Sequence, residues 1–407
     1  MKKLVLVLSL LVLTALIVVG CASPAPSAPA QVTVIVPQTV IVPQTVVVPA
    51  TPAAASSSSA APAATKAPVP TVAPASSSSS SVASSAAPVA TGGRLKTVLD
   101  RKKLVCGING SLVGFSTLAP NGDYVGFDAD FCRIAAAALF GDVKAVEFRK
   151  VNTTERFAAI QSGDVDIVFR NTTVTLGRDT QNGVDFLPTT FYDGGGMMVP
   201  VKSNVKKLED LNGATICVLE GTTNVQVLAD VFKARNIKYT AQTFKDAETL
   251  YKALDAGQCD AATSDKSQLA GQRASLVKNP NDYVVLDETM SKEPLTPMVA
   301  QNDSQWRDVM TYVVYATFYA EEMGITSKNV DQMKTSTDPN LQNFFGVTND
   351  LPKKAGFPTN DAFFNEIKLV GNYGEIYDRN ITPLGITRGL NAPYTKGGLL
   401  YAPPLRP

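Results

Sequence analysis

Short apolar runs alternate with helix-length amphipathic runs in two successive cycles, and this alternation constrains the fold more than any other feature of the chain. In the first cycle we expect strands at 104–108, 146–150 and 166–169, and helices at 128–140 and 154–162, the latter capped by Thr153 or Thr154. The second cycle follows 199–201, with strands expected at 215–219, 238–244 and 260–263 and helices at 225–234 and 246–256. This βαβ rhythm predicts an α/β protein with two doubly wound, mostly parallel sheets that face each other across a cleft.

Polar residues follow the carboxyl ends of several of these strands, which is where parallel sheets bind ligands. The strand at 167–169 is followed by a run of hydroxyl and amide side chains and, one helical turn later, by Arg178. A guanidinium grips both oxygens of a carboxylate, while hydroxyls and backbone N–H groups fill the remaining lone pairs. Thr173, Thr223 and Asp265 all follow strand ends. The pattern predicts a site for a small carboxylate; the alternative is an ordinary strand-to-helix turn capped by threonine.

Several classes of function are disfavoured by composition. The sequence contains no histidine, which removes the Ser-His-Asp and Cys-His catalytic arrangements and the common histidine metal ligands. Neither a Walker loop nor a dinucleotide-type glycine signature is present. Removing Lys2 and Lys3 from the 37 Lys and Arg residues leaves 35 basic residues against 36 acidic ones. The protein therefore has no excess of positive charge that would attract nucleic acid. We therefore expect no catalytic residue, no cofactor, no metal and no nucleic-acid partner.

The N-terminus predicts export. Two lysines precede an uncharged apolar run at 4–19, which is shorter than the roughly 20 residues that a membrane-spanning helix needs. The run ends in Val18-Val19-Gly20-Cys21, which resembles a bacterial lipobox. The resemblance implies that residues 1–20 are a signal peptide, cut before Cys21, and that the Cys21 thiol carries a lipid; a retained membrane anchor is the alternative. We expect the mature protein on the extracytoplasmic face of the bacterial cell membrane, anchored by acyl chains.

Residues 21–93 are expected to form a disordered tether. Between 22 and 92 the only charged side chain is Lys66, and Ala, Ser, Pro, Thr and Val dominate, so the segment cannot bury enough surface to offset its chain entropy. The hexamer Val34-Ile-Val-Pro-Gln-Thr39 recurs at 40–45 and, altered, at 46–51. A proline every sixth residue argues against a stable sheet. We interpret the repeats as a stiff spacer, with a β-type association site as the alternative.

Four cysteines remain after Cys21, and an exported location favours disulfides among them. Four cysteines allow three pairings. Cys106 falls in the first strand and Cys132 early in the first helix, whereas Cys217 and Cys259 belong to the second cycle. We predict the pairs Cys106–Cys132 and Cys217–Cys259, one in each domain. Four free buried thiols are the alternative, and the absence of a C-x-x-C pair disfavours a four-cysteine metal site.

A set of motifs, weak singly but specific in order and spacing, resembles the polar amino-acid-binding proteins of bacterial ABC importers, extracellular solute-binding protein family 3. The motifs are Gly122-Asp-Tyr-Val-Gly126-Phe127-Asp128-Ala-Asp130, Ala159-Ile-Gln-Ser-Gly163-Asp164, Gly221-Thr222-Thr223 and Asp260-Ala-Ala-Thr-Ser-Asp265. The resemblance covers about residues 96–404. Within the family the chain is most similar to the general L-amino-acid-binding branch. The motifs shared with that branch are Arg170-Asn-Thr-Thr173, Gly371-Asn-Tyr-Gly-Glu-Ile-Tyr-Asp-Arg379-Asn380 and the segment from Arg388-Gly-Leu-Asn391 to Tyr401-Ala-Pro-Pro404.

The resemblance implies a two-lobed, type II periplasmic-binding-protein fold. Lobe 1 would comprise 94–200 and, after the chain returns, 294–407, while lobe 2 would comprise 201–293, with crossings near Pro200 and Pro294. A helical pattern around Trp306 indicates that this residue belongs to the core. The C-terminal extension from Ser327, with Tyr373, Tyr377 and Tyr401, either packs on the body or presents a surface to the transporter.

The resemblance also implies the roles of individual site residues. Arg178 would bind the ligand α-carboxylate, assisted by the hydroxyl and N–H of Thr173 and by Thr223 from the other lobe, and Asp265 would receive the α-ammonium. The alternatives are a surface pair of Arg178 with Asp179 and helix capping by Asp265 or by the threonines at 222 and 223.

Further positions line the expected site. Asn171 and Leu219 match lining positions, and Phe115 matches an aromatic near the ligand, with packing under the site as its alternative. Leu112 stands where many relatives place an aromatic, which weakens any preference for a cationic or aromatic ligand. We hypothesise that Arg170 meets the side-chain carboxylate or amide of Glu, Gln, Asp or Asn; a salt bridge with an acid such as Asp166 is the alternative.

These features together predict a binding protein that captures free L-amino acids by cleft closure. It would deliver them to the transmembrane subunits of an ABC permease and their ATPase, while its lipid anchor holds it at the membrane. Two alternatives are an amino-acid sensor that presents its ligand to a receptor and, less favoured because histidine is absent, an exported dehydratase on the same fold.

Overall fold

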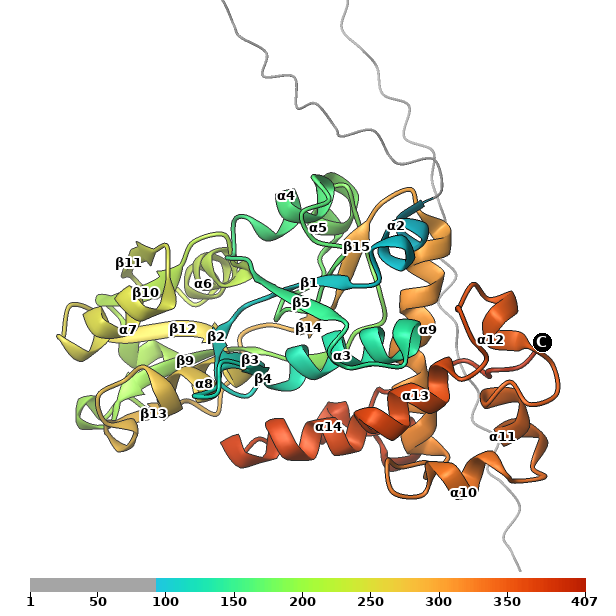
Figure 1. Cartoon of the computed structure of the whole chain (residues 1–407). Coiled ribbons are helices and arrows are strands. Elements are labelled where there is room, and N and C mark those ends of the chain that lie inside the picture. Colours follow the sequence, from blue (N-terminus) through green and yellow to red (C-terminus); the bar gives the residue numbers. More distant parts are fainter. Residues whose placement is uncertain (1–92) are drawn as a thin grey trace, which may run out of the picture. The chain divides into compact units, whose positions relative to one another are not determined.

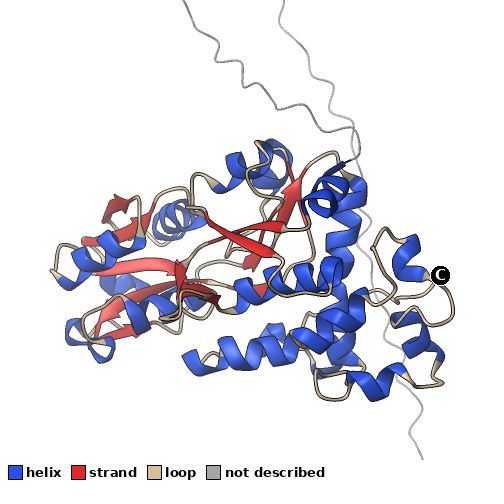
Figure 2. Ribbon diagram, viewed as in Figure 1, coloured by secondary structure: helices blue, strands red, loops and turns tan. Residues whose placement is uncertain are grey.

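The computed structural model describes residues 93–407, and most of its strands form two five-stranded sheets, each flanked by helices (Figures 1 and 2). The signal peptide, the lipidation site at Cys21 and the tether expected at 21–93 lie, apart from residue 93, outside the described residues. The first sheet has the order β5-β1-β6-β15-β7 and contains β1 (Leu104–Ile108), β5 (Val146–Lys150), β6 (Ile167–Val168), β7 (Val184–Phe186) and β15 (Met298–Ala300). The second has the order β11-β10-β12-β9-β13 and contains β9 (Gly195–Pro200), β10 (Ala214–Leu219), β11 (Tyr239–Phe244), β12 (Ala261–Asp265) and β13 (Tyr283–Val285).

In each sheet a single strand runs against the other four. β1 pairs parallel with β5 and β6, and only β15 is antiparallel to its neighbours. In the second sheet β10 pairs parallel with β11 and β12, and only β9 is antiparallel. Sheets of this kind must be covered on both faces, which is why β1 (LVCGI) is apolar and buried along its whole length and β10 is buried from Ile216 to Leu219. The predicted α/β class with two mostly parallel sheets is confirmed; the sheets define lobe 1 and lobe 2 below.

Helices follow the strands in the expected order. Lobe 1 carries α2 (Gly93–Arg101), α3 (Phe127–Phe140), α4 (Arg156–Gln161), α5 (Leu176–Gln181) and α9 (Ser304–Glu322), and lobe 2 carries α6 (Thr223–Ala234), α7 (Ala247–Asp255) and α8 (Lys266–Ser275). The cap expected for α4 is wrong, because neither Thr153 nor Thr154 caps it. The Asn152 side chain instead accepts the N–H groups of Thr154 and Glu155, which forms a turn that delays the start of the helix.

The chain crosses between the lobes through a two-stranded antiparallel sheet of β8 (Phe191–Asp193) and β14 (Glu293–Leu295). The second crossing is formed by β14, which contains Pro294. The first lies before β9 rather than near Pro200, because β9 already pairs with β12 of lobe 2. The three glycines at 194–196 make this early entry possible: a methyl group on Gly194 would lie 2.4 Å from the Thr289 side chain.

The C-terminal extension continues the hydrophobic core of lobe 1. Its helices are α10 (Val330–Lys334), α11 (Pro339–Phe344), α12 (Leu351–Lys354), α13 (Ala362–Leu369) and α14 (Tyr373–Asn380). α13 and α14 both pack on α3 and α9, in the lower half of Figure 1. Tyr373 and Tyr377 are fully buried, so the packing interpretation holds for them, whereas Tyr401 is 59% exposed. Trp306 is buried in the same core, as predicted.

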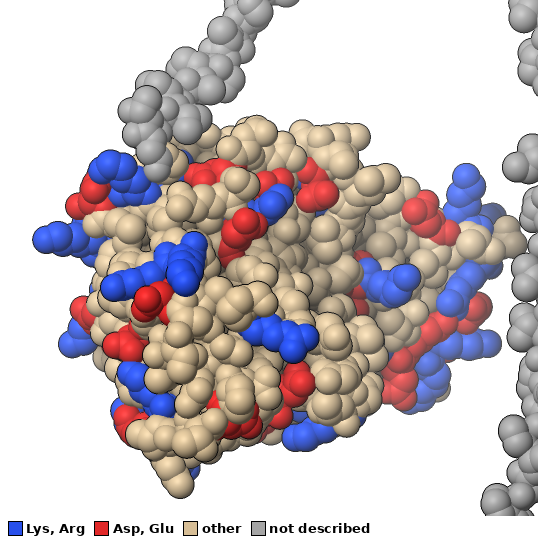
Figure 3. Space-filling model, turned by 90° about the vertical axis from the view of Figure 1, so that its right-hand side faces the viewer, with Lys and Arg blue, Asp and Glu red and all other residues tan. Residues whose placement is uncertain are grey.

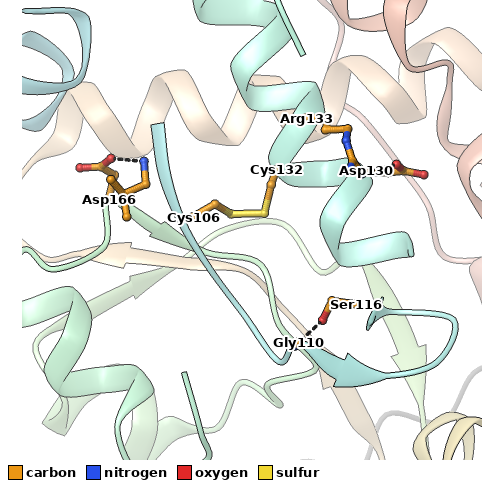
Figure 4. Close-up of a disulfide and its surroundings, with 8 residues drawn as sticks. Cys106, Gly110, Ser116, Asp130, Cys132, Arg133 and Asp166 are labelled. Carbon is orange, nitrogen blue, oxygen red and sulfur yellow. Dashed lines mark hydrogen bonds and ion pairs between the residues drawn. A yellow bond between two sulfur atoms is a disulfide. The ribbon is translucent and has the colours of Figure 1, made fainter. Parts of the chain in front are cut away.

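Both predicted disulfides are confirmed. Cys106–Cys132 joins β1 to α3 inside lobe 1 (Figure 4), and Cys217–Cys259 joins β10 to the residues before β12 in lobe 2. The bonded residues are 26 and 42 positions apart, and loop-closure entropy then corresponds to about 3.5 and about 4 kcal/mol of stabilisation. Because neither bond joins the two lobes, both are compatible with motion of one lobe relative to the other.

The strands β2 (Ser111–Leu112), β3 (Ser116–Leu118) and β4 (Tyr124–Val125) form an antiparallel sheet at the lobe 1 edge of the cleft. On the face shown in Figure 3, basic and acidic side chains are interspersed, in agreement with the balanced charge of the sequence. Within residues 93–407, no helix is both long enough and apolar enough to span a membrane.

Candidate functional site

A cavity between the two lobes gathers most of the predicted site residues. Its lining comes from both lobes and consists of Thr153, Arg156, Arg170, Asn171, Thr173, Arg178, Thr222, Thr223, Asn224, Asp265 and Gln268. The volume of this central cavity is about 10 Å³, roughly the room that one water molecule needs. The lobes are therefore closed on each other in this structure.

Arg178 lies in the first turn of α5, where Thr175 caps the helix by accepting the Arg178 N–H at 3.2 Å. Its guanidinium donates to the carbonyl oxygen of Thr173 at 2.8 Å and, across the cleft, to that of Gly221 at 3.2 Å. Burial lowers the pKa of Arg178, while the carboxylates Asp265 and Glu293 raise it. The alternative surface pair with Asp179 is wrong, because the side chain turns into the cavity instead.

Arg156, which the sequence patterns did not single out, is the second arginine of the site. It is 2% exposed and donates to the Thr172 hydroxyl at 3.2 Å and to the Gly221 carbonyl at 3.1 Å. Its buried Nε has no hydrogen-bond partner among residues 93–407. Burial, together with the charges of Arg170 and Arg178, lowers its pKa well below the ordinary value. An arginine early in a short helix is ordinarily a surface residue, so only the direction of α4 reveals its role.

Arg170 is the third arginine and is 6% exposed. Its Nε donates to the Val151 carbonyl at 3.2 Å, whereas no described residue accepts a hydrogen bond from its two terminal amino groups. The alternative salt bridge with Asp166 is wrong, because that carboxylate is bound by Arg94, Arg101 and the Val105 N–H. Burial lowers the pKa of Arg170 to about 10, a shift that the Arg178 charge increases and the charge of Asp128 opposes.

Asp265, at the end of β12, is 4% exposed and accepts a hydrogen bond from Asn224 at 2.9 Å. It precedes α8 but makes no side-chain capping bond, so the capping alternative is wrong. Burial is the main cause that raises its pKa, and the neighbouring carboxylates Asp193 and Glu293 raise it further. A cationic partner would stabilise the ionised form of Asp265, because its positive charge offsets both the burial and the neighbouring negative charges.

Glu293 is a further site residue that sequence reasoning missed. It lies on the crossing strand β14, directly opposite Asp193 on β8, and is 1% exposed. One of its oxygens accepts the hydroxyl of Thr173 from lobe 1 at 2.5 Å and that of Thr223 from lobe 2 at 2.8 Å. The other oxygen accepts the Ser291 hydroxyl at 2.5 Å. Asp193, Asp265 and Glu293 thus form an acidic group at the crossing, while the three arginines lie on the lobe 1 side.

The threonines of the Gly221-Thr222-Thr223 motif do not act as helix caps through their side chains. Thr222 occupies the N-cap position of α6 without a capping hydrogen bond, and its hydroxyl donates to the Leu219 carbonyl at 2.7 Å. Gly221 has a φ of +71°, and a methyl group there would lie 3.1 Å from Thr154 across the cleft. Glycine is therefore required both for the turn and for the close approach of the lobes.

Of the other predicted residues, Asn171 lines the central cavity, whereas Leu219 and Phe115 do not. Asn171 lines the central cavity and bridges the lobes by donating to Gln268 at 2.8 Å. Leu219 lines a neighbouring cavity instead of the central one. Phe115 is fully buried and packs edge-on against Phe127 and Phe191, with ring centroids 6.0 and 5.3 Å away. It lies outside the cavity lining, so the packing alternative describes its contacts better than ligand binding does.

Comparison with known proteins shows what this arrangement is similar to. The family model for bacterial extracellular solute-binding proteins, family 3, matches residues 104–322. The general L-amino acid-binding periplasmic protein AapJ of Rhizobium johnstonii is 45% identical over 338 residues, which are 82% of this chain and 98% of the relative. The glutamate/glutamine/aspartate/asparagine-binding protein BztA of Rhodobacter capsulatus is 43% identical over 324 residues, 79% of this chain and 95% of the relative.

A solved structure is similar over nearly its whole length. It is an ABC transporter periplasmic binding protein from Brucella ovis with glutathione bound. The TM-score is 0.75 and the sequence identity 43%, and the alignment covers 77% of this chain and 99% of the other.

Proposed function

The chain belongs to family 3 of the bacterial extracellular solute-binding proteins, and on this premise we propose that it is the amino-acid-binding component of an ABC importer. It captures polar L-amino acids outside the cytoplasmic membrane and delivers them to the transmembrane subunits of a permease and their ATPase. We also propose that the lipid on Cys21 holds it at the membrane. The observation that carries the proposal is the closed cavity between the lobes, which Arg156, Arg170 and Arg178 line from lobe 1 and Asp265 lines from lobe 2. Asp193 and Glu293 add negative charge beside Asp265. A free amino acid is a zwitterion and needs both poles.

Arg178 and Arg156 bind the α-carboxylate in this proposal. Both guanidinium groups presently share one neutral acceptor, the Gly221 carbonyl oxygen. A carboxylate is a stronger acceptor for guanidinium than a carbonyl, and each such charge-assisted bond contributes roughly 1.5–3 kcal/mol. The buried Nε of Arg156 offers a further donor that this ligand group would satisfy.

Asp265 receives the α-ammonium, and Glu293 determines how Thr173 and Thr223 take part. A hydroxyl has one proton and two lone pairs. Because both threonines donate that proton to Glu293, their oxygens are left as acceptors. The two hydroxyls therefore accept hydrogen bonds from the ammonium. The resemblance led us to expect them to assist the α-carboxylate; in this proposal the carboxylate keeps the Thr173 N–H and the arginines.

Arg170 sets the preference for the ligand side chain. Its two terminal amino groups have no acceptor among the described residues, and they lie at the edge of the central cavity. A side-chain carboxylate or amide of Glu, Gln, Asp or Asn supplies the missing acceptor. The name of BztA, which states binding of glutamate, glutamine, aspartate and asparagine, supports this choice of ligands.

Binding proceeds by opening and closing of the lobes at β8 and β14. The central cavity of about 10 Å³ is too small for an amino acid, so the lobes separate to admit one. The ligand first binds the arginines of lobe 1, and closure then brings Asp265 and Thr223 from lobe 2 over the ammonium. Contacts such as Asn171 to Gln268 at 2.8 Å hold the closed form.

A thermal-shift screen of the twenty amino acids with the purified protein, followed by calorimetry, tests the proposal. A ligand that binds only the folded state stabilises it by about 2.7 kcal/mol at one hundred times its Kd. We expect glutamate, glutamine, aspartate and asparagine to raise Tm, and small-angle scattering to show compaction on saturation. The proposal is wrong if none of the twenty raises Tm. Stimulation of the ATPase of a reconstituted cognate permease tests delivery and separates the importer from a sensor.

A further inference from the structure

A second cavity lies beside the central one and shares part of its wall. Its volume is about 100 Å³. Thr153, Arg170 and Gln268 line both cavities, so the two are neighbours on either side of these residues. The outer cavity is lined in addition by Asn109, Ser111, Lys150, Val151, Asn152, Leu219, Lys245, Asp246 and Ala247.

Two lysines come to the outer cavity from equivalent positions of the two lobes. Lys150 is the last residue of β5, the edge strand that pairs with β1, and Lys245 directly follows β11, the edge strand that pairs with β10. Both therefore lie at the carboxyl ends of corresponding strands, one on each side of the cleft. The stem of Lys150 runs over Gly110, where a methyl group would lie only 3.0 Å from its Cγ.

The charges of these lysines are not compensated within the cavity. Neither the Lys150 nor the Lys245 side chain makes an ion pair or a hydrogen bond with any described residue, although both line the outer cavity. The one carboxylate in the lining, Asp246, caps α7 by accepting the Thr249 N–H at 2.8 Å and the Thr249 hydroxyl at 2.9 Å. Together with the free amino groups of Arg170, the outer cavity has three cations and one carboxylate already in use.

The rest of the wall of the outer cavity is uncharged. It contains neutral hydrogen-bonding side chains, among them Asn109, Asn152 and Gln268, and the apolar Leu219 and Ala247. Neutral amides match a peptide bond, which offers one N–H and one C=O, and the apolar residues match methylene groups. Such a wall accommodates an extended ligand chain that carries an amide and ends in an anion.

We propose that the outer cavity is a subsite for amino acids whose side-chain carboxyl is linked through an amide to a further residue with a free carboxylate, as in γ-glutamyl dipeptides. This inference rests on the proposed function, because the α-ammonium and α-carboxylate occupy the central site. Arg170 then faces the γ-amide region, and Lys150 and Lys245 bind the distal carboxylate from the two lobes. The lysines thereby take part in closure when the ligand is long enough to reach them.

Calorimetry with the full chain and three ligands tests the subsite. The ligands are L-glutamate, γ-L-glutamylglycine and γ-L-glutamylethylamide, the last of which has the amide extension but lacks the distal carboxylate. We expect wild-type protein to bind γ-glutamylglycine roughly tenfold more tightly than γ-glutamylethylamide, because two lysines contact the extra carboxylate. In the variant Lys150→Ala/Lys245→Ala this difference falls to within about twofold, while glutamate affinity stays unchanged.

A matched control carries the same loss of charge. Lys144→Ala/Lys233→Ala removes one exposed lysine from each lobe outside both cavities, and it retains the tenfold difference. The subsite is refuted if wild-type protein binds both extended ligands equally, or binds glutamate but neither of them. It is also refuted if the Lys150/Lys245 variant loses affinity for glutamate and γ-glutamylglycine equally, which indicates general attraction of anions. Failure of all three ligands on wild-type protein refutes instead the proposed function.

Discussion

Gly271→Ala tests whether the closed arrangement of the lobes is the one that binds ligand. Gly271 lies in α8 of lobe 2, and α8 packs against β2 of lobe 1. A methyl group on Gly271 would lie 2.6 Å from the carbonyl oxygen of Val113 and 3.1 Å from the Leu112 side chain. The first atom belongs to the backbone, so it cannot turn aside as the end of a flexible side chain would.

The clash exists only when the lobes are closed, and its magnitude follows from overpacking. Extra methyl groups in well-packed contacts cost about 1–3 kcal/mol, and a cost confined to the closed state weakens ligand affinity by roughly 5- to 150-fold. The same substitution favours α8 itself, since alanine is better than glycine inside a helix by about 1 kcal/mol. Gly271→Ala is therefore expected to weaken binding without lowering the Tm of the ligand-free protein.

Calorimetry with glutamate, a thermal melt without ligand and small-angle scattering with saturating ligand form the assay. Gly177→Ala is the control, because it adds the same methyl group to a helix where the nearest atom is the Gln181 side chain at 3.9 Å. We expect weaker binding and reduced compaction for Gly271→Ala alone. Wild-type affinity and full compaction in this variant would refute the closed arrangement as the ligand-bound one. A fall in Tm without ligand would show damage to the fold instead.

Three further predictions concern single side chains. Arg170→Ala should weaken the binding of glutamate and glutamine by about tenfold or more in calorimetry, because it removes a charge-assisted hydrogen bond to the ligand side chain. The affinity for alanine should stay unchanged, and equal losses for all ligands would contradict a role of Arg170 in side-chain recognition. Glu293→Gln should reduce the preference for glutamate over glutarate, which lacks the ammonium. The substitution removes a negative charge beside the ammonium site, and a neutral amide oxygen is a weaker acceptor than a carboxylate for the hydroxyls of Thr173 and Thr223; an unchanged preference would contradict the assignment of Thr173 and Thr223 to the ammonium. Glu366→Gln concerns a fully buried carboxyl whose two oxygens have no hydrogen-bond partner among residues 93–407 and whose pKa burial raises well above 4.5. The folded state holds this proton more tightly than the unfolded state, so the free energy of unfolding falls as pH rises from the unfolded pKa towards the raised folded pKa, and the variant should lack that part of the fall. Urea unfolding at pH 4 and pH 7 measures it, and a difference between wild type and variant that is the same at both pH values would count against it.

The features that local sequence predicts well are those that short-range physics dictates. The strands and helices of both cycles, and the pairing of Cys106 with Cys132 and of Cys217 with Cys259, follow from hydrophobic periodicity and from the placement of each cysteine on its element. Arg178 and Asp265, whose roles the family resemblance implied, both line the central cavity, and these roles stay predictions. The position of the first crossing was missed because β9 reads as a strand of either lobe until its partner β12 is known.

Other features depend on groups that are distant in sequence and close in space. Glu293 reads as an ordinary residue beside a proline, and only the meeting of β14 with Thr173 and Thr223 makes it part of the site. Arg156 reads as a surface arginine until the direction of α4 buries it. The sequence by itself thus determined the strands and helices of the two cycles, because these arise from patterns within a few residues, and it predicted the disulfides from the element on which each cysteine lies. The tertiary structure alone decided which side chains are buried together, since burial and charge pairing depend on how the two lobes pack against each other.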